Sequence, residues 1–138
     1  MINITKETSV SIDDVLPLYQ AVGWTNYTNQ PQMLEQSLAH SLATYLARDG
    51  EEIVGVVRLV GDGFSSVFVQ DLIVLPSYQR QGIGSALMEK ALGDFKDAYQ
   101  VQLATDQTEK TLGFYRSLGF ETLSTYDCTG MIWVDRKK

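Results

Sequence analysis

A glutamine and two glycines stand directly before an apolar pattern with helical spacing, and residues of these types could bind an anion. Gln79, Gly82 and Gly84 follow an apolar run that ends at Pro76. The first backbone N–H groups of a helix have no partner within it, so such a loop offers free donors beside the positive end of the helix dipole. Glycines let phosphate groups come close to the backbone. The stretch predicts a strand, a phosphate-binding loop and a helix, with Arg80 adding positive charge at the rim.

Neither of the two common nucleotide-binding patterns fits this loop. A P-loop needs a lysine followed by serine or threonine after its last glycine, and the sequence has neither at that place. A dinucleotide-binding fingerprint needs a third glycine, and Leu87 stands there instead. A nucleotide-binding domain is therefore disfavoured. For the loop taken alone, an ordinary glycine-bearing connection before a helix remains the plain alternative.

A second informative stretch, Phe-Tyr-Arg-Ser-Leu-Gly-Phe, ends at Phe120. Phe114 and Leu118 lie four residues apart and would pack on one side of a helix, after which Gly119 lets the chain reverse. Tyr115 between them allows two interpretations. A phenol can act as a general acid, or it can be a core aromatic ring with a polar tip.

The patterns Q-x-x-G-x-G and F-Y-x-x-L-G-F, about thirty residues apart, resemble the two signatures of the GNAT N-acetyltransferase family. The resemblance covers nearly the whole chain and implies one domain over residues 1–138. It implies an acetyl-CoA-dependent N-acetyltransferase that moves the acetyl group to a primary amine of a small molecule, such as an aryl or alkyl amine. A peptide or protein amine as acceptor, and a non-catalytic acyl-CoA-binding module, are the alternatives.

The resemblance also implies the residues of the site. The strand before the loop would pair with the pantetheine arm of coenzyme A as an extra strand does. A backbone N–H of Ile73 or Val74 would stabilise charge on the carbonyl oxygen. Tyr115 would be the general acid, since a phenol with a pKa of ~10 is protonated at neutral pH. The residues expected to bind the cofactor are Leu72, Ile73, Val74, Gln79, Arg80, Gln81, Gly82, Ile83, Gly84, Ser85 and Thr108. Thr108 departs from the pattern, because many relatives carry Asn there.

The acceptor side is expected among the first two helices and the loop that joins them, because loops carry specificity on a rigid scaffold. Trp24 and Tyr27 either form a wall of the acceptor site or pack these helices onto the sheet. Asp71 is a third candidate, although alternation places its side chain opposite to Gln70 and Leu72 unless a bulge re-aims it.

No general base can be assigned. Glu35 and His40 fit a solvated surface as well as they fit a proton acceptor. A single histidine and a single cysteine, Cys128, cannot form a metal site of His and Cys ligands, so no metal is expected.

The composition restricts the partners and the compartment. The net charge of −6 argues against nucleic acid or anionic lipid, and it would suit a cationic amine beside aromatic rings. The lone cysteine and the absence of a long apolar run predict a cytoplasmic protein. A homodimer is a further expectation by analogy, with Trp133 on the last strand as a core residue or dimer contact.

The pattern of elements predicts a mixed α/β fold, in which a mostly antiparallel sheet is flanked by about four helices on both faces. Helices are expected to begin at Ser11, Pro31, Gly84 and Thr108, after residues of capping type or at proline. Strands are expected over residues 2–6, 44–48, 53–60, 66–75, 99–104, 120–126 and 128–134.

Overall fold

The computed structural model describes residues 1–135. The chain divides into two compact units, residues 1–104 and residues 105–138, and each is described by itself. The first unit contains the whole sheet and four of the α-helices, whereas the second contains the helix with Tyr115.

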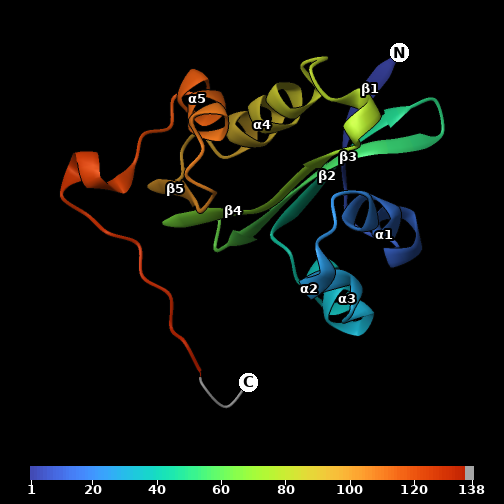
Figure 1. Cartoon of the computed structure of the whole chain (residues 1–138), viewed down its shortest axis with the longest axis horizontal. Coiled ribbons are helices and arrows are strands. Elements are labelled where there is room, and N and C mark those ends of the chain that lie inside the picture. Colours follow the sequence, from blue (N-terminus) through green and yellow to red (C-terminus); the bar gives the residue numbers. More distant parts are fainter. Residues whose placement is uncertain (136–138) are drawn as a thin grey trace. The chain divides into compact units, whose positions relative to one another are not determined.

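The sheet of the first unit has five strands in the order in which they occur along the chain (Figure 1). They are β1 (Ile2–Glu7), β2 (Ala43–Asp49), β3 (Glu52–Gly61), β4 (Ser66–Val74) and β5 (Gln100–Leu103). The neighbours β1 to β4 are antiparallel: short turns join β2 to β3 and β3 to β4, whereas residues 8–42, which contain helices, lie between β1 and β2. The last strand, β5, is parallel to β4, and a helical crossover connects them. The predicted mixed, mostly antiparallel sheet is confirmed.

The helices of the first unit begin where the local chemistry favours them. They are α1 (Ile12–Ala21), α2 (Thr25–Thr28), α3 (Pro31–Ala39) and α4 (Ile83–Asp94), and a 3-10 turn, η1 (Pro76–Tyr78), precedes α4. Ser11 caps α1 by accepting a hydrogen bond from the backbone N–H of Asp13 at 3.3 Å. Pro31 is the first residue of α3, where its missing N–H costs nothing.

Helices cover both faces of the sheet, with α1, α2 and α3 on one face and α4 on the other (Figure 1). The core of the first face joins apolar residues of these helices, such as Val15 and Leu34, to Val56 and Ile73 of the strands. On the second face α4 lies so close to β3 that a Cβ at Gly55 would come within 3.0 Å of the Leu87 side chain. Glycine at this position therefore lets α4 pack on the sheet.

The second unit contains α5 (Glu109–Ser117) and a 3-10 turn, η2 (Leu123–Tyr126). The expected strand pair over residues 120–126 and 128–134 is wrong, because the described part of this segment contains the turn and no strand. Trp133 is 82% exposed, so it is not a core residue. Apolar alternation alone predicted these strands, but a strand also needs a neighbour for its backbone groups.

Two smaller differences concern connections. The loop expected to join the first two helices contains the four-residue helix α2 (Thr25–Thr28), so the first unit has one helix more than expected. The turn η1 between β4 and the glycines was also not predicted. Both are too short to show a periodic pattern in the sequence.

Candidate functional site

The turn after β4 is fixed to the β2–β3 hairpin by one side chain. The hydroxyl of Tyr78 lies 2.8 Å from Oδ2 of Asp49 and 3.3 Å from Oε1 of Glu52. The hydrogen bond with Asp49 raises the pKa of Tyr78 to about 12, so the phenol remains a donor at neutral pH. One residue later, the side chain of Gln79 donates to the backbone oxygen of Val74 at 3.2 Å. The loop over residues 79–85 thus begins at a fixed position.

The N-terminus of α4 has the form that an anion site requires. Gly82 is the N-cap, in the left-handed region at φ 79°, and no side chain caps the helix. A Cβ added there would meet nothing within 4 Å, so the space beside the backbone is open. The first hydrogen bond of the helix runs from Ala86 N to Gly82 O, which leaves the N–H groups of the preceding turn without helical partners.

Those free N–H groups belong to Ile83, Gly84 and Ser85. Arg80 and Gln81 precede them and are exposed, and Arg80 also has a positive φ of 66°. A non-glycine residue in the left-handed region is uncommon and points to a constraint on the loop. The loop therefore offers backbone donors and one guanidinium on its open side, which is the chemistry a pyrophosphate needs.

One edge of β4 opens next to this loop. The parallel pairing with β5 covers Ser66 to Val69, and in the described part of the chain no strand pairs with that edge beyond Val69. The N–H of Leu75 donates to Val54 O at 2.9 Å, so Leu75 faces β3. Since backbone groups alternate in direction along a strand, Ile73 also faces β3, whereas Leu72 and Val74 face the open edge. This alternation favours Val74 over Ile73 as a donor towards that edge.

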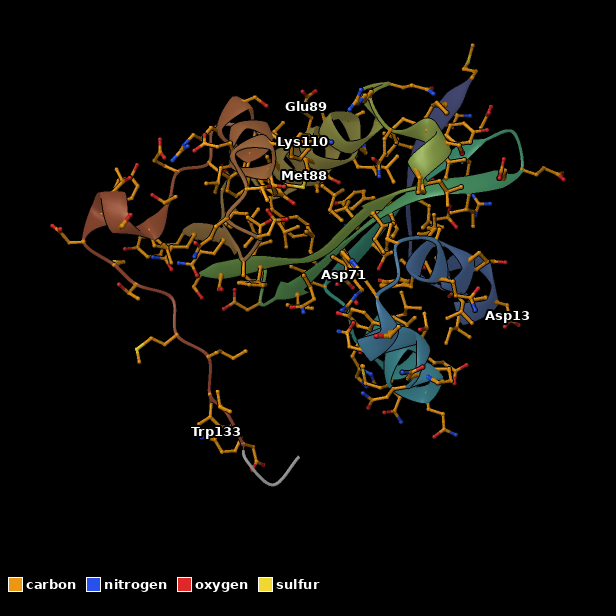
Figure 2. All side chains as sticks on the ribbon, in the orientation of Figure 1. Asp13, Asp71, Met88, Glu89, Lys110 and Trp133 are labelled. Atoms are coloured by element: carbon orange, nitrogen blue, oxygen red, sulfur yellow. The ribbon has the colours of Figure 1, made fainter. Side chains whose placement is uncertain are left out.

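A bulge in β4 lies where the pairing with β5 ends. Arg58 of β3 pairs with Asp71, and its neighbour Leu59 pairs with Val69, so Gln70 is the extra residue. Arg58 and Leu59 are adjacent in β3, so their side chains point to opposite faces of the sheet. Their partners Asp71 and Val69 therefore also point to opposite faces, which two residues separated by one would not do in a regular strand. The bulge turns Asp71 towards the face covered by α1, α2 and α3 (Figure 2).

The Asp71 carboxylate accepts three hydrogen bonds in the interior. Tyr19 donates to Oδ2 and Tyr27 to Oδ1, each at 2.8 Å, and Nε of Arg58 donates to Oδ2 at 2.8 Å. The other guanidinium nitrogens of Arg58 donate to the Tyr27 hydroxyl and to Ser41 Oγ, both at 3.2 Å. Asp71 is thus committed to a buried network, and its oxygens are not free to serve as a general base.

The electrostatics of the network keep the two tyrosines and the arginine in fixed protonation states. Burial, together with the negative charge of Asp71, raises the pKa of both Tyr19 and Tyr27, so both phenols stay neutral donors. Burial alone would lower the pKa of Arg58, but Asp71 reverses this and raises it, so the guanidinium stays charged.

The aromatic residues expected on the acceptor side pack together. The ring of Tyr27 lies 4.9 Å from that of Tyr19 and 6.3 Å from that of Trp24, measured between centroids. Tyr27 is buried and Trp24 half-buried. Packing of the helices onto the sheet is therefore a role of both rings, and a wall of the acceptor site stays a prediction. Glu35 and His40 are both exposed on α3 or just after it.

Tyr115 lies on α5 in the second unit, between two other aromatic rings. Its ring centroid is 5.0 Å from that of Phe114 and 5.8 Å from that of Phe120, both edge-to-face. Burial, and then the negative charge of Asp106, raise the pKa of the Tyr115 hydroxyl above its ordinary value. The phenol therefore holds its proton at neutral pH, as a general acid must.

Thr108 caps α5. Its Oγ1 accepts a hydrogen bond from the backbone N–H of Thr111 at 3.3 Å and donates to Asp106 Oδ1 at 2.6 Å. This capping role accounts for a threonine at the position. Its contact with a cofactor stays a prediction.

Sequence reasoning missed Arg58, Tyr19 and Gln70. Arg58 carried a signal, because a charged residue inside the otherwise apolar strand at residues 53–60 needs a buried partner. Tyr19 carried no distinguishing signal, because a tyrosine within an amphipathic helix is most often a core residue. The sequence holds no signal for the role of Gln70, because a bulge depends on the register between two strands.

Two further observations concern residues 1–135. In this part of the chain, no group of three or more His, Cys, Asp or Glu side chains is arranged to hold a metal ion. None of its helices has both the length and the apolar character needed to cross a bilayer.

Comparisons of this chain with a family model, with solved structures and with curated proteins agree with one another. A family model described as an acetyltransferase (GNAT) domain matches residues 40–122. A GNAT-family protein of known structure from Streptococcus pneumoniae is 72% identical, with a TM-score of 0.92 over 99% of each chain. An acetyltransferase from Elizabethkingia anophelis with acetyl-CoA bound is 23% identical, with a TM-score of 0.65 over 87% of this chain and 76% of that one.

Among curated proteins, serotonin N-acetyltransferase 2 of rice, Oryza sativa subsp. japonica, is 29% identical over 82% of this chain. The chain spans 58% of that protein's length, and 65% of the length of an Arabidopsis thaliana relative.

Proposed function

Because this chain belongs to the GNAT acetyltransferase family, we propose that it transfers an acetyl group from acetyl-CoA to the primary amine of a small molecule. The observation that carries the proposal is the uncapped N-terminus of α4 beside the open edge of β4. One feature binds a pyrophosphate and the other binds an extended amide chain, and coenzyme A contains both.

The residues that would hold coenzyme A follow from these two features. Backbone N–H groups of Ile83, Gly84 and Ser85 would bind the pyrophosphate, with Arg80 as a charged partner. Leu72 and Val74 would pair with the pantetheine arm through their outward backbone groups. Gly82 supports this fit, because the position where a Cβ would lie is open space.

Bound acetyl-CoA supplies an activated acyl group, and the protein is left with two tasks, to stabilise the developing charge and to hold a proton for the leaving group. The N–H of Val74 is the candidate donor to the oxygen on which charge develops. The hydroxyl of Tyr115 holds a proton that can be given to a leaving group. The packing of Tyr115 against Phe114 and Phe120 fixes the orientation of its ring.

The acceptor is proposed to be a small aryl or alkyl amine. The relationship to a serotonin N-acetyltransferase, the aromatic pair Trp24 and Tyr27 and the net charge of −6 all support a cationic or aromatic amine. An amine that is charged in solution must lose a proton before it attacks. No carboxylate of the described network is free for this, so a water molecule is the proposed proton acceptor.

A coenzyme A release assay tests the proposal. The protein is supplied with acetyl-CoA and, in turn, tryptamine, spermidine or a lysine-containing peptide, and the free thiol is measured. Release that saturates with tryptamine or spermidine supports a small-molecule acceptor. Turnover of the peptide alone would move the acceptor class to peptides or proteins. Saturable binding of acetyl-CoA with no release from any amine would instead support a non-catalytic acyl-CoA-binding module.

A further inference from the structure

The apolar run at the end of β4 does not by itself determine which side chains face α1, α2 and α3. Residues 72–75 are Leu, Ile, Val and Leu, so both sets of alternate side chains are apolar. Hydrophobic burial specifies the register of a strand where apolar and polar residues alternate, and here they do not. A further interaction must therefore distinguish two registers of β4 against β3 that differ by one residue.

Before the bulge, Val69 turns its backbone groups away from β3. The N–H of Leu42, the residue before β2, donates to Leu59 O at 2.8 Å, so the backbone of Leu59 faces β2. Val69 is the partner of Leu59 in the ladder, and its backbone groups therefore face β5. With regular alternation, the backbone groups of Asp71 and Ile73 would follow Val69 and also face away from β3.

Beyond the bulge, this alternation is reversed. The N–H of Leu75 donates to Val54 O at 2.9 Å, so the backbone groups of Leu75 and Ile73 face β3. The N–H groups of Leu72 and Val74 consequently face the open edge. The one extra residue of the bulge thus decides which backbone N–H groups can meet an extended chain at that edge.

A buried ion pair distinguishes the two registers. With the bulge, Asp71 lies opposite Arg58, with Oδ2 and Nε 2.8 Å apart and side chains that are 2% and 4% exposed. Tyr19 and Tyr27 also donate to this carboxylate, each at 2.8 Å. Without the bulge, Gln70 would lie opposite Arg58, and the carboxylate would point to the other face of the sheet. A buried guanidinium that has lost its carboxylate is strongly destabilising, so the pair favours the bulged register.

From this geometry we propose that the buried pair of Arg58 and Asp71 fixes β4 in the bulged register. The pair thereby places the N–H groups of Leu72 and Val74, rather than that of Ile73, at the open edge. Arg58 and Asp71 are then positioning residues, because they act through the backbone of β4. The assignment of this edge to coenzyme A rests on the proposed function, whereas the register can be measured without any ligand.

A swap of two neighbouring side chains tests the inference. Gln70→Asp combined with Asp71→Gln moves the carboxylate one residue along β4 without changing the composition. The carboxylate should still pair with the guanidinium, so the bulge should be lost. Hydrogen exchange followed in nitrogen-15 spectra reports the register. In the unaltered protein the N–H of Ile73 should exchange about tenfold or more slowly than those of Leu72 and Val74, and in the swapped variant this order should reverse.

Binding of acetyl-CoA, measured by calorimetric titration, is the second readout. The Kd of the swapped variant should rise about tenfold or more, because two backbone donors to the pantetheine arm turn away from the edge. Asp94→Asn is the control, since the Asp94 carboxylate accepts a hydrogen bond of 2.8 Å from Tyr45 at a different place. This variant should keep the order of exchange, and its Kd should stay within about twofold of the unaltered value.

A milder variant keeps the inference testable if the swapped protein does not fold. Asp71→Asn removes the charge that favours the bulged register, so the difference in exchange between Ile73 and its two neighbours should shrink by about threefold or more.

Three results would count against these proposals. An unreversed order of exchange in the folded swapped variant, or in its place an unchanged difference in Asp71→Asn, overturns the role of the ion pair. A reversed order with undiminished binding of acetyl-CoA overturns its role at the cofactor edge. Failure of the unaltered protein to acetylate any amine would overturn the proposed function instead, and the order of exchange would still decide what fixes the register.

Discussion

At the scale of single residues, the ion pair between Arg58 and Asp71 is almost fully withdrawn from water. The two side chains are 4% and 2% exposed and lie 2.8 Å apart. Replacing Arg58 by Met leaves the buried carboxylate without its cation, which should lower the free energy of unfolding by ~3–5 kcal/mol. Urea denaturation followed by fluorescence measures this loss.

The pair of Arg48 and Glu7 provides the matched control. Its atoms lie 2.9 Å apart, but its side chains are 30% and 28% exposed. Arg48→Met should therefore lower the free energy of unfolding by only ~0–1 kcal/mol. Equal losses of unfolding free energy for the two substitutions would contradict the prediction that burial makes the Arg58–Asp71 pair more important for stability than the Arg48–Glu7 pair.

We expect proton transfer to the leaving group to depend on Tyr115. Tyr115→Phe keeps the ring contacts with Phe114 and Phe120 but removes the hydroxyl, so the fold should be retained. The turnover number should fall roughly a hundredfold or more, with little change in the KM of acetyl-CoA. Coenzyme A release kinetics measure both, and a melting curve checks the fold. Turnover at the unaltered rate would remove Tyr115 from the mechanism.

The raised pKa of Tyr115 predicts a pH dependence. A phenol loses its donor proton above its pKa, so the high-pH fall in rate should lie above the ordinary value of ~10. Asp106→Asn removes a negative charge that disfavours the phenolate, so the pKa should drop and the fall should move to lower pH. Phenolate absorbance, with Tyr115→Phe as the reference, measures the pKa directly. A pKa that stays the same or rises in Asp106→Asn would contradict this cause.

The sequence identified only part of the candidate site at this scale. Gln79, Gly82 and Tyr115 could be singled out because glycine, glutamine and a motif tyrosine stand at recognisable spacings in the chain. Arg58 and Gln70 could not be given roles, because these depend on which residues of β3 and β4 lie opposite each other. A single extra residue in β4 reverses the face of every side chain after it.

At the scale of elements, the N-terminus of α4 must keep its left-handed glycine. Gly82→Ala places a Cβ on a residue at φ 79°, which should destabilise the fold by about 1 kcal/mol and weaken acetyl-CoA binding by distorting the first turn. Gly93→Ala is the control, because Gly93 lies within the same helix without a positive φ and with open space around it. It should stabilise the fold by about 0.5–1 kcal/mol.

Calorimetric titration of acetyl-CoA into both glycine variants checks this prediction. Gly93→Ala should bind acetyl-CoA as the unaltered protein does. If Gly82→Ala binds equally well, the geometry of the first turn of α4 is not what holds the ligand.

Most elements were predictable where a capping residue or a clear period marked them. Ser11, Pro31 and Thr108 begin helices as their chemistry predicts. The terminal strands over residues 120–126 and 128–134 were wrong, although their apolar residues alternate. Alternation describes one strand, whereas a sheet needs backbone partners that the local sequence does not specify.

At the scale of the whole molecule, the order of elements was enough to predict a mixed, mostly antiparallel sheet, although two of the seven expected strands are not formed within residues 1–135. Short turns make β2, β3 and β4 antiparallel neighbours, and the crossover through α4 makes β5 parallel to β4. The antiparallel pairing of β1 with β2 spans a long connection through α1, α2 and α3. The parting of β4 and β5 after Val69 could not be predicted, because it depends on how far β5 extends. A single domain over residues 1–138 stays a prediction.

A ligand that binds only the folded protein raises its melting temperature. Acetyl-CoA at a free concentration a hundred times its Kd should stabilise the fold by ~2.7 kcal/mol. ATP at the same concentration should have a smaller effect, because the 79–85 loop lacks the lysine of a P-loop. A larger effect of ATP would revive a nucleotide-binding domain as the interpretation of this loop.

The central claim is that the first turn of α4 and the open edge of β4 hold coenzyme A. A nitrogen-15 titration with acetyl-CoA tests this claim most directly, because it reports on each backbone N–H. The largest shifts should occur at Gly82, Ile83, Gly84 and Ser85, with further shifts at Leu72 and Val74. Saturable binding that leaves these N–H groups unmoved would contradict the account.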